Sequence, residues 1–67
     1  MKKRTIENAK SQLKEFGFIT VTFYAGRNYE HGGEILNFNT IEELQEFLMF
    51  GVRAEDDIHI PNANYFN

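Results

Sequence analysis

The chain has 67 residues, no cysteine and a formal net charge of −3, which limits it to one small domain without disulfides or thiolate-bound metal. Its apolar runs are shorter than the roughly 18 residues of a membrane span. The basic start, residues 1–4, is followed by polar residues and not by the apolar stretch of a signal peptide. We therefore expect a cytoplasmic protein.

Charge is unevenly distributed along the chain. Residues 1–14 hold five basic residues and one acid, whereas residues 15–67 hold two basic residues and nine acids. Such polarity argues against a general binder of polyanions and favours association with a complementary partner.

A first helix is predicted over residues 3–16, ended by Gly17 in a left-handed conformation. At helical spacing its buried face consists of Ile6, Ala9, Leu13 and Phe16. Ser11 is expected in solvent together with the charged residues. Thr5-Ile6-Glu7 is echoed by Thr40-Ile41-Glu42 in a second helix, so a threonine is expected at the start of each.

Two strands follow. Residues 18–25 are rich in aromatic and β-branched side chains, which favours a strand. An eight-residue connection, 26–33, leads to a returning strand over 34–38. Alternation places one set toward the helices: Ile19, Val21, Phe23, Leu36 and Phe38. The other face, half apolar, holds Phe18, Thr20, Thr22, Tyr24, Ile35 and Asn37.

The second helix is predicted from Thr40, its N-cap, to Gly51, which is expected to adopt a left-handed backbone. Glu43 can bond back to the N–H of the cap. The core-facing residues are Ile41, Leu44, Phe47 and Leu48, with Glu42, Glu43 and Glu46 opposite. Met49 and Phe50 do not fit the buried face; they either fold under the next segment or form part of an interface.

The end of the chain is predicted as a polar loop, a short strand and a docked tail. The loop covers residues 52–57, and the strand covers 58–60 with His59 facing outward. Pro61 ends the strand because it cannot donate to a sheet. Tyr65 and Phe66 are expected to dock the tail.

These elements predict a single α+β domain over residues 1–67 with the order α-β-β-α-β. Two helices cover one face of a mainly antiparallel three-stranded sheet, and the other face stays open. Leu44, Phe47 and Leu48 are expected to pack against Val21, Phe23 and Leu36.

Two polar clusters contain residue types that occur in catalytic or metal sites. In the loop 27–33, Glu30 and His31 could act as an acid–base pair with Arg27 binding an anion, but an exposed turn or a recognition loop fits better. Glu55, Asp56, Asp57 and His59 match no metal-binding spacing. We expect no catalytic site, cofactor or metal.

The sequence favours a small non-catalytic regulator or inhibitor that acts through protein–protein contact. We expect a homodimer built either on the open sheet face or on Phe50 and the aromatic tail, Tyr65 and Phe66. Its acidic surface could imitate nucleic acid toward a basic target. The alternative is a nucleic-acid-binding module that uses the basic first helix and the aromatic sheet face. The residues expected to bind a partner are Phe18, Tyr24, Arg27, Tyr29, Ile35, Glu42, Glu46, Met49, Phe50, Asp56 and Asp57.

Overall fold

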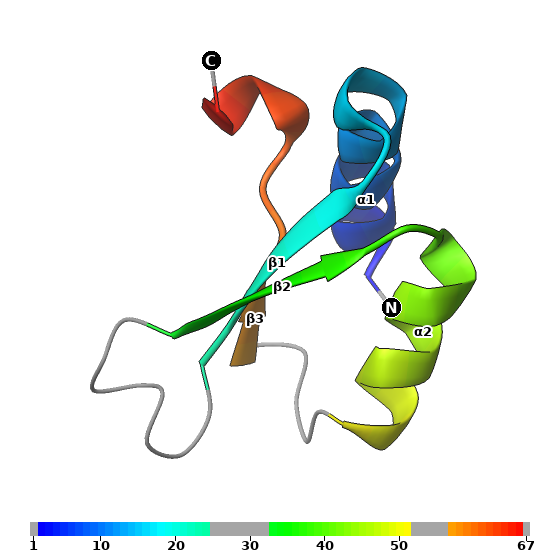
Figure 1. Cartoon of the computed structure of the whole chain (residues 1–67), viewed down its shortest axis with the longest axis vertical. Helices are drawn as coiled ribbons and strands as arrows, with labels where there is room; N and C mark the ends of the chain where they lie inside the picture. Colours follow the sequence, from blue (N-terminus) through cyan, green and yellow to red (C-terminus); the bar gives the residue numbers. More distant parts are fainter. Residues whose placement is uncertain (1, 25–32, 52–56, 67) are drawn as a thin grey trace.

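The structure, a computed structural model, describes residues 2–24, 33–51 and 57–66 (Figure 1). Its elements are α1 (Lys3–Phe16), β1 (Ile19–Phe23), β2 (Glu34–Phe38), α2 (Ile41–Phe50), β3 (Ile58–His59) and the 3-10 helix η3 (Ala63–Phe66). The predicted α+β class and the order α-β-β-α-β are confirmed, and η3 is an addition. None of the helices in the described ranges combines the length and apolar character that crossing a membrane requires.

The sheet has the strand order β2-β1-β3, and both pairs are antiparallel. β1 is therefore central, between β2, which follows it directly in the chain, and β3, which comes from the C-terminal part. It is shorter than the predicted 18–25, since Phe18 lies before it and pairing with β2 runs from Ile19 opposite Phe38 to Phe23 opposite Glu34. β2 has the predicted bounds.

The core lies between the sheet and the two helices, which cover the same face (Figure 1). Its buried residues are Ala9, Ile19, Val21, Leu44 and Ile60. Leu44 has no exposed surface, as predicted, whereas Phe47 and Leu48 are only half-buried. Phe47 packs edge-on against Phe23 with ring centroids 5.5 Å apart, and a chain of 67 residues has too little volume to enclose both rings.

Helix α1 has the predicted bounds but begins and packs differently. Its N-cap is Lys2, whose side chain makes no capping hydrogen bond, so Thr5 lies inside the helix and does not start it. Gly17 ends it with φ +81° and donates to Leu13, as predicted. Phe16 was expected in the core and is instead 40% exposed, because the last turn of α1 extends past the core to the C-terminal segment.

Polar residues of α1 hold the C-terminal segment in place. The Asn8 side chain donates to the carbonyl of Ile60 at 3.0 Å, and the Ser11 hydroxyl accepts from the backbone N–H of Ala63 at 2.9 Å. Ser11 was expected in solvent but is half-buried. The docked residue of the tail is Ala63, while Tyr65 and Phe66 stay exposed.

Gln12 is the one fully buried polar side chain in the described ranges. Its Oε1 accepts from the N–H of Thr20 at 2.7 Å, and its Nε2 donates to the carbonyls of Thr20 (3.2 Å) and Pro61 (2.8 Å). Its carboxamide therefore links α1, β1 and the C-terminal segment in one network.

Helix α2 confirms its predicted cap and its predicted end before Gly51, but not the predicted conformation of that glycine. The Thr40 hydroxyl accepts from the N–H of Glu43 at 3.1 Å, while the Glu43 carboxylate accepts from Asn39, one residue before the cap. Gly51 has φ −112° and is not left-handed. A Cβ there would lie 3.0 Å from the carbonyl oxygen of Phe47, so close approach explains the glycine.

Candidate functional site

The sheet face opposite α1 and α2 is a surface that the fold leaves partly exposed. Cross-strand pairing places Thr20 beside Asn37, and Thr22 between Ile35 and His59. The Thr20 hydroxyl donates to the side-chain oxygen of Asn37 at 3.1 Å. This face was predicted to be open and half apolar, and both Ile35 and Asn37 are exposed on it.

Aromatic rings gather at the Thr20 end of this face. Phe66 packs edge-on against Phe16 and Tyr65, with ring centroids 5.7 and 5.4 Å away. Phe18 lies 6.3 Å from Phe16, and His59 packs edge-on against Tyr65 at 5.7 Å. We call these five residues the ring cluster; they come from the end of α1, the link between α1 and β1, β3 and η3.

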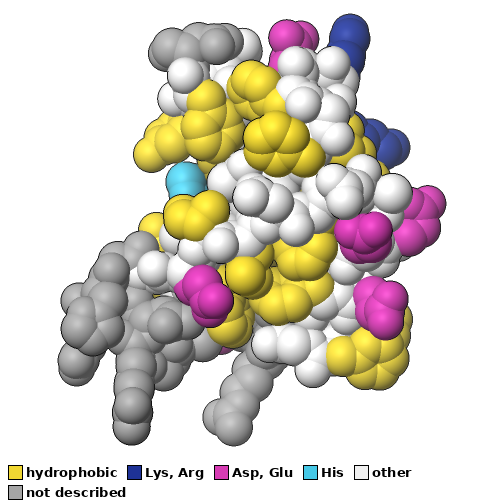
Figure 2. Space-filling model, in the orientation of Figure 1, with side chains coloured by type: hydrophobic (Ala, Val, Ile, Leu, Met, Phe, Trp, Pro, Cys, Tyr) yellow, Lys and Arg dark blue, Asp and Glu magenta, His cyan; other side chains and the backbone are white. Residues whose placement is uncertain are grey.

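The side chains of the ring cluster are exposed. Phe16 and Phe18 are 40% exposed and Tyr65 is 69% exposed. Figure 2 shows the histidine beside a group of hydrophobic side chains on this side of the molecule. Phe16, Phe18, Thr20 and Phe66 line a shallow pocket of about 200 Å³. A pocket of this size suits one or two side chains of another protein better than a drug-sized ligand.

Local backbone conformation sets the orientation of these rings. The left-handed Gly17 reverses the chain between Phe16 and Phe18, so both rings lie on the same side. In η3, the N–H of Tyr65 donates to the carbonyl of Asn62 at 2.9 Å. With Ala63 buried beneath it, this turn leaves Tyr65 and Phe66 on the outside.

At the opposite end of the face, Tyr24 covers Gly33. A Cβ on Gly33 would lie 2.9 Å from the Tyr24 ring and 2.8 Å from the Thr22 methyl group, and Gly33 has φ +90°. Tyr24 is half-buried and its N–H donates to the carbonyl of Asp57 at 2.6 Å. Tyr24, a predicted contact residue, is thus fixed on the face by its neighbours.

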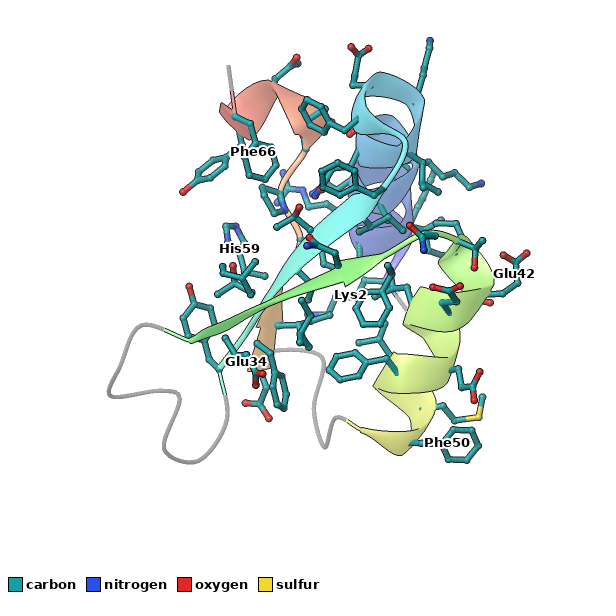
Figure 3. All side chains as sticks on the ribbon, viewed as in Figure 1. Lys2, Glu34, Glu42, Phe50, His59 and Phe66 are labelled. Carbon is teal, nitrogen blue, oxygen red and sulfur yellow. The ribbon has the colours of Figure 1, made fainter. Side chains whose placement is uncertain are left out.

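The other predicted contact residues lie elsewhere. Met49 and Phe50 are 73% and 79% exposed at the end of α2, and Glu42 and Glu46 are exposed along it. Figure 3 shows Phe50 and Phe66 at opposite ends of the molecule, so Phe50 and the aromatic tail do not form one surface. Asp57 is half-buried, and Arg27, Tyr29 and Asp56 lie outside the described residues.

A polar groove of about 670 Å³ lies beside the ring cluster. It runs between the start of α1 and the C-terminal segment and is lined by Lys2, Arg4, Thr5, Asn8, Ile58, His59, Ile60, Pro61 and Asn62. None of these residues is acidic. His59 therefore borders both the groove and the ring cluster.

Sequence reasoning missed part of this surface. The sequence pattern places Phe16 in the core and gives His59 no contact role, and it groups Tyr65 and Phe66 with Phe50 instead of with the sheet face. Their proximity depends on how the tail folds back, which helical or strand periodicity does not report. No group of three or more potential metal ligands occurs among the described residues.

Comparisons of the chain with protein families, with curated proteins and with solved structures found no match.

Proposed function

We propose that this chain is a small non-catalytic regulator or inhibitor that acts through protein–protein contact, and that the ring cluster with the open sheet face is its contact surface. The observation that carries the proposal is the exposure of five rings, drawn from separate segments, on the sheet face opposite α1 and α2. Aromatic side chains dominate the energetics of protein interfaces because they bury large areas at little entropic cost.

The chemistry of the face supports a protein partner. The paired residues between the ring cluster and Ile35 are the neutral Thr20, Thr22 and Asn37. A quarter of the chain is charged, so a neutral patch with aromatic rings at its edge is a departure from the rest of the surface. Interface centres show the same depletion of charge and enrichment of aromatic residues.

The test is capture of a partner from the source cell by the immobilised chain and by matched variants. The variant F18S/F66S removes two exposed rings of the ring cluster, and Phe50→Ser removes one exposed ring at the other end of the molecule. We expect a defined protein that the wild type and Phe50→Ser retain and F18S/F66S loses. Circular dichroism of each variant checks that the fold is kept.

Other outcomes contradict the surface assignment. If Phe50→Ser or E42Q/E46Q loses the partner and F18S/F66S keeps it, α2 is the contact surface and imitation of nucleic acid by its glutamates gains support. If no variant changes the capture, neither surface carries the function.

Binding of single-stranded nucleic acid is the second candidate. The groove with Lys2, Arg4 and His59 lies beside exposed rings, and phosphate contacts combined with stacked bases are the usual means of binding single strands. Against it stand the net charge of −3 and the nine acids after residue 14.

A further inference from the structure

The outer edge of β2 is a second surface that the fold leaves open. Within the described ranges, the order β2-β1-β3 leaves β2 bordered by β1 on one side and by no strand on the other. Its residues are the most exposed of the three-stranded sheet, with Glu34, Ile35 and Asn37 all exposed. An edge strand presents unpaired backbone donors and acceptors to any further strand.

The hydrogen bonds of β1 show which β2 groups point outward. Tyr24 donates its N–H to Asp57, next to β3, and the N–H and C=O of Thr20 both bond to Gln12 on that same side. Main-chain groups of successive residues point to opposite sides of a strand. Ile19, Val21 and Phe23 therefore direct their N–H and C=O groups toward β2.

The register of β1 with β2 shows which main-chain groups of β2 point toward β1 and which point away from it. Ile19, Val21 and Phe23 lie opposite Phe38, Leu36 and Glu34, so these three β2 residues bond to β1. Ile35 and Asn37 then point their N–H and C=O groups away from the sheet. The outer edge offers two donors and two acceptors in alternation.

This edge carries few of the features that block pairing. Edge strands are usually protected by proline, lysine, a bulge or very short length. β2 has five residues, none of which is proline or lysine, and its register with β1 is continuous. Its one charge, Glu34, lies at the first position.

The edge is also complementary to itself. A two-fold axis at Leu36 places Ile35 opposite Asn37 of a second copy, and Asn37 opposite its Ile35, so all four outward groups of each strand are paired. Leu36 then faces its own counterpart in a non-hydrogen-bonded pair, where side chains lie closest. Leu36 is half-buried on the helix-covered face, and this pairing buries it further.

We propose that a second copy of this chain binds along β2, antiparallel and in this register, to form one continuous six-stranded sheet. The axis is perpendicular to the sheet, so both open faces lie on one side and the helices on the other. The two copies thereby present one wider contact surface. This deepens the proposed function, on which the use of the wider surface rests, but the pairing itself does not depend on it.

Two double variants test the register by sedimentation equilibrium. In I35K/N37K, each pair across the axis would hold two lysines, and like charges directly opposite destabilise strand pairing. In I35K/N37E, the same positions would hold a lysine opposite a glutamate. We expect the wild type and I35K/N37E to reach twice the 7.9 kDa of one chain, and I35K/N37K to dimerise about tenfold more weakly or not at all.

Amide hydrogen exchange tests the same pairing without a substitution. The N–H groups of Ile35 and Asn37 should exchange more slowly as the protein concentration rises, while that of Leu36, bonded to β1, should not change. A wild type that stays at 7.9 kDa at high concentration overturns the proposal. So does a dimer in which both double variants associate equally, or in which Ile35 and Asn37 gain no protection.

The partner-capture variants separate this inference from the proposed function. F18S/F66S alters the ring cluster and leaves the edge intact, so it should dimerise as the wild type does while losing the partner. A monomer that still captures a partner through the ring cluster refutes the edge pairing alone.

Discussion

At the scale of single residues, Gln12 supplies the hydrogen bonds that a longer β3 would otherwise make to β1. The β1–β3 register pairs Thr22 with His59, and its continuation would set Thr20 opposite Pro61. Proline has no N–H to offer the carbonyl of Thr20. The Gln12 carboxamide fills this place by bonding to both main-chain groups of Thr20 and to the carbonyl of Pro61.

Replacement of Gln12 by leucine should therefore destabilise the fold by about 2–4 kcal/mol, since it leaves buried donors and acceptors without partners. Gln45→Leu is the matched control, because Gln45 is an exposed glutamine on α2 and its replacement should change stability by less than about 0.5 kcal/mol. Urea unfolding of both variants measures the difference. Equal midpoints would show that the network contributes nothing.

Two glycines differ in what an added methyl group would meet. Gly17 and Gly33 both have positive φ, but open space surrounds a Cβ at Gly17 while one at Gly33 would touch Thr22 and Tyr24 within 3 Å. We expect Gly17→Ala to cost about 1–2 kcal/mol from backbone strain and Gly33→Ala to cost more. Thermal melts of the two variants rank them, and a milder effect of Gly33→Ala would contradict the close packing of Tyr24.

At the scale of elements, α2 is held by its cap and by one buried residue. Leu44 is fully buried in the core, whereas Met49, on the same helix, is 73% exposed. Leu44→Ala should cost about 2–5 kcal/mol, the usual range for a buried large-to-small change. Met49→Ala, the control, should change stability by less than about 0.5 kcal/mol. A denaturant midpoint for Leu44→Ala near that of the control would mean that the wrong face of α2 was assigned to the core.

At the scale of the whole molecule, the balance of charge separates the two candidate functions. The polar groove, which includes Lys2 and Arg4, borders the ring cluster, but the chain as a whole is acidic. We expect no micromolar binding to random duplex or single strands at physiological salt, because affinity for nucleic acid depends mainly on phosphate contacts. Fluorescence anisotropy with labelled oligonucleotides over a salt series measures this. Tight binding that weakens steeply with salt, and that Arg4→Gln reduces, would favour the nucleic-acid candidate.

Local sequence determined the elements and much of the covered face. The bounds of α1 and β2, the Thr40 cap, the burial of Leu44 and the outward position of His59 follow from spacing and from the chemistry of neighbouring residues. These features depend on interactions within a few residues, for which period and capping rules suffice.

Tertiary structure alone decided which segments meet. Phe16 lies outside the core and packs against Phe66 of η3, and Gln12 is buried where Pro61 leaves a place in the sheet unfilled. The order β2-β1-β3 fixes the free edge at β2. The contacts of Phe16 with Phe66 and of Gln12 with Pro61 join residues that are far apart in the sequence. Side-chain periodicity reports which way a residue faces but not what it faces, so the ring cluster and the β2 edge emerge only when the chain is folded.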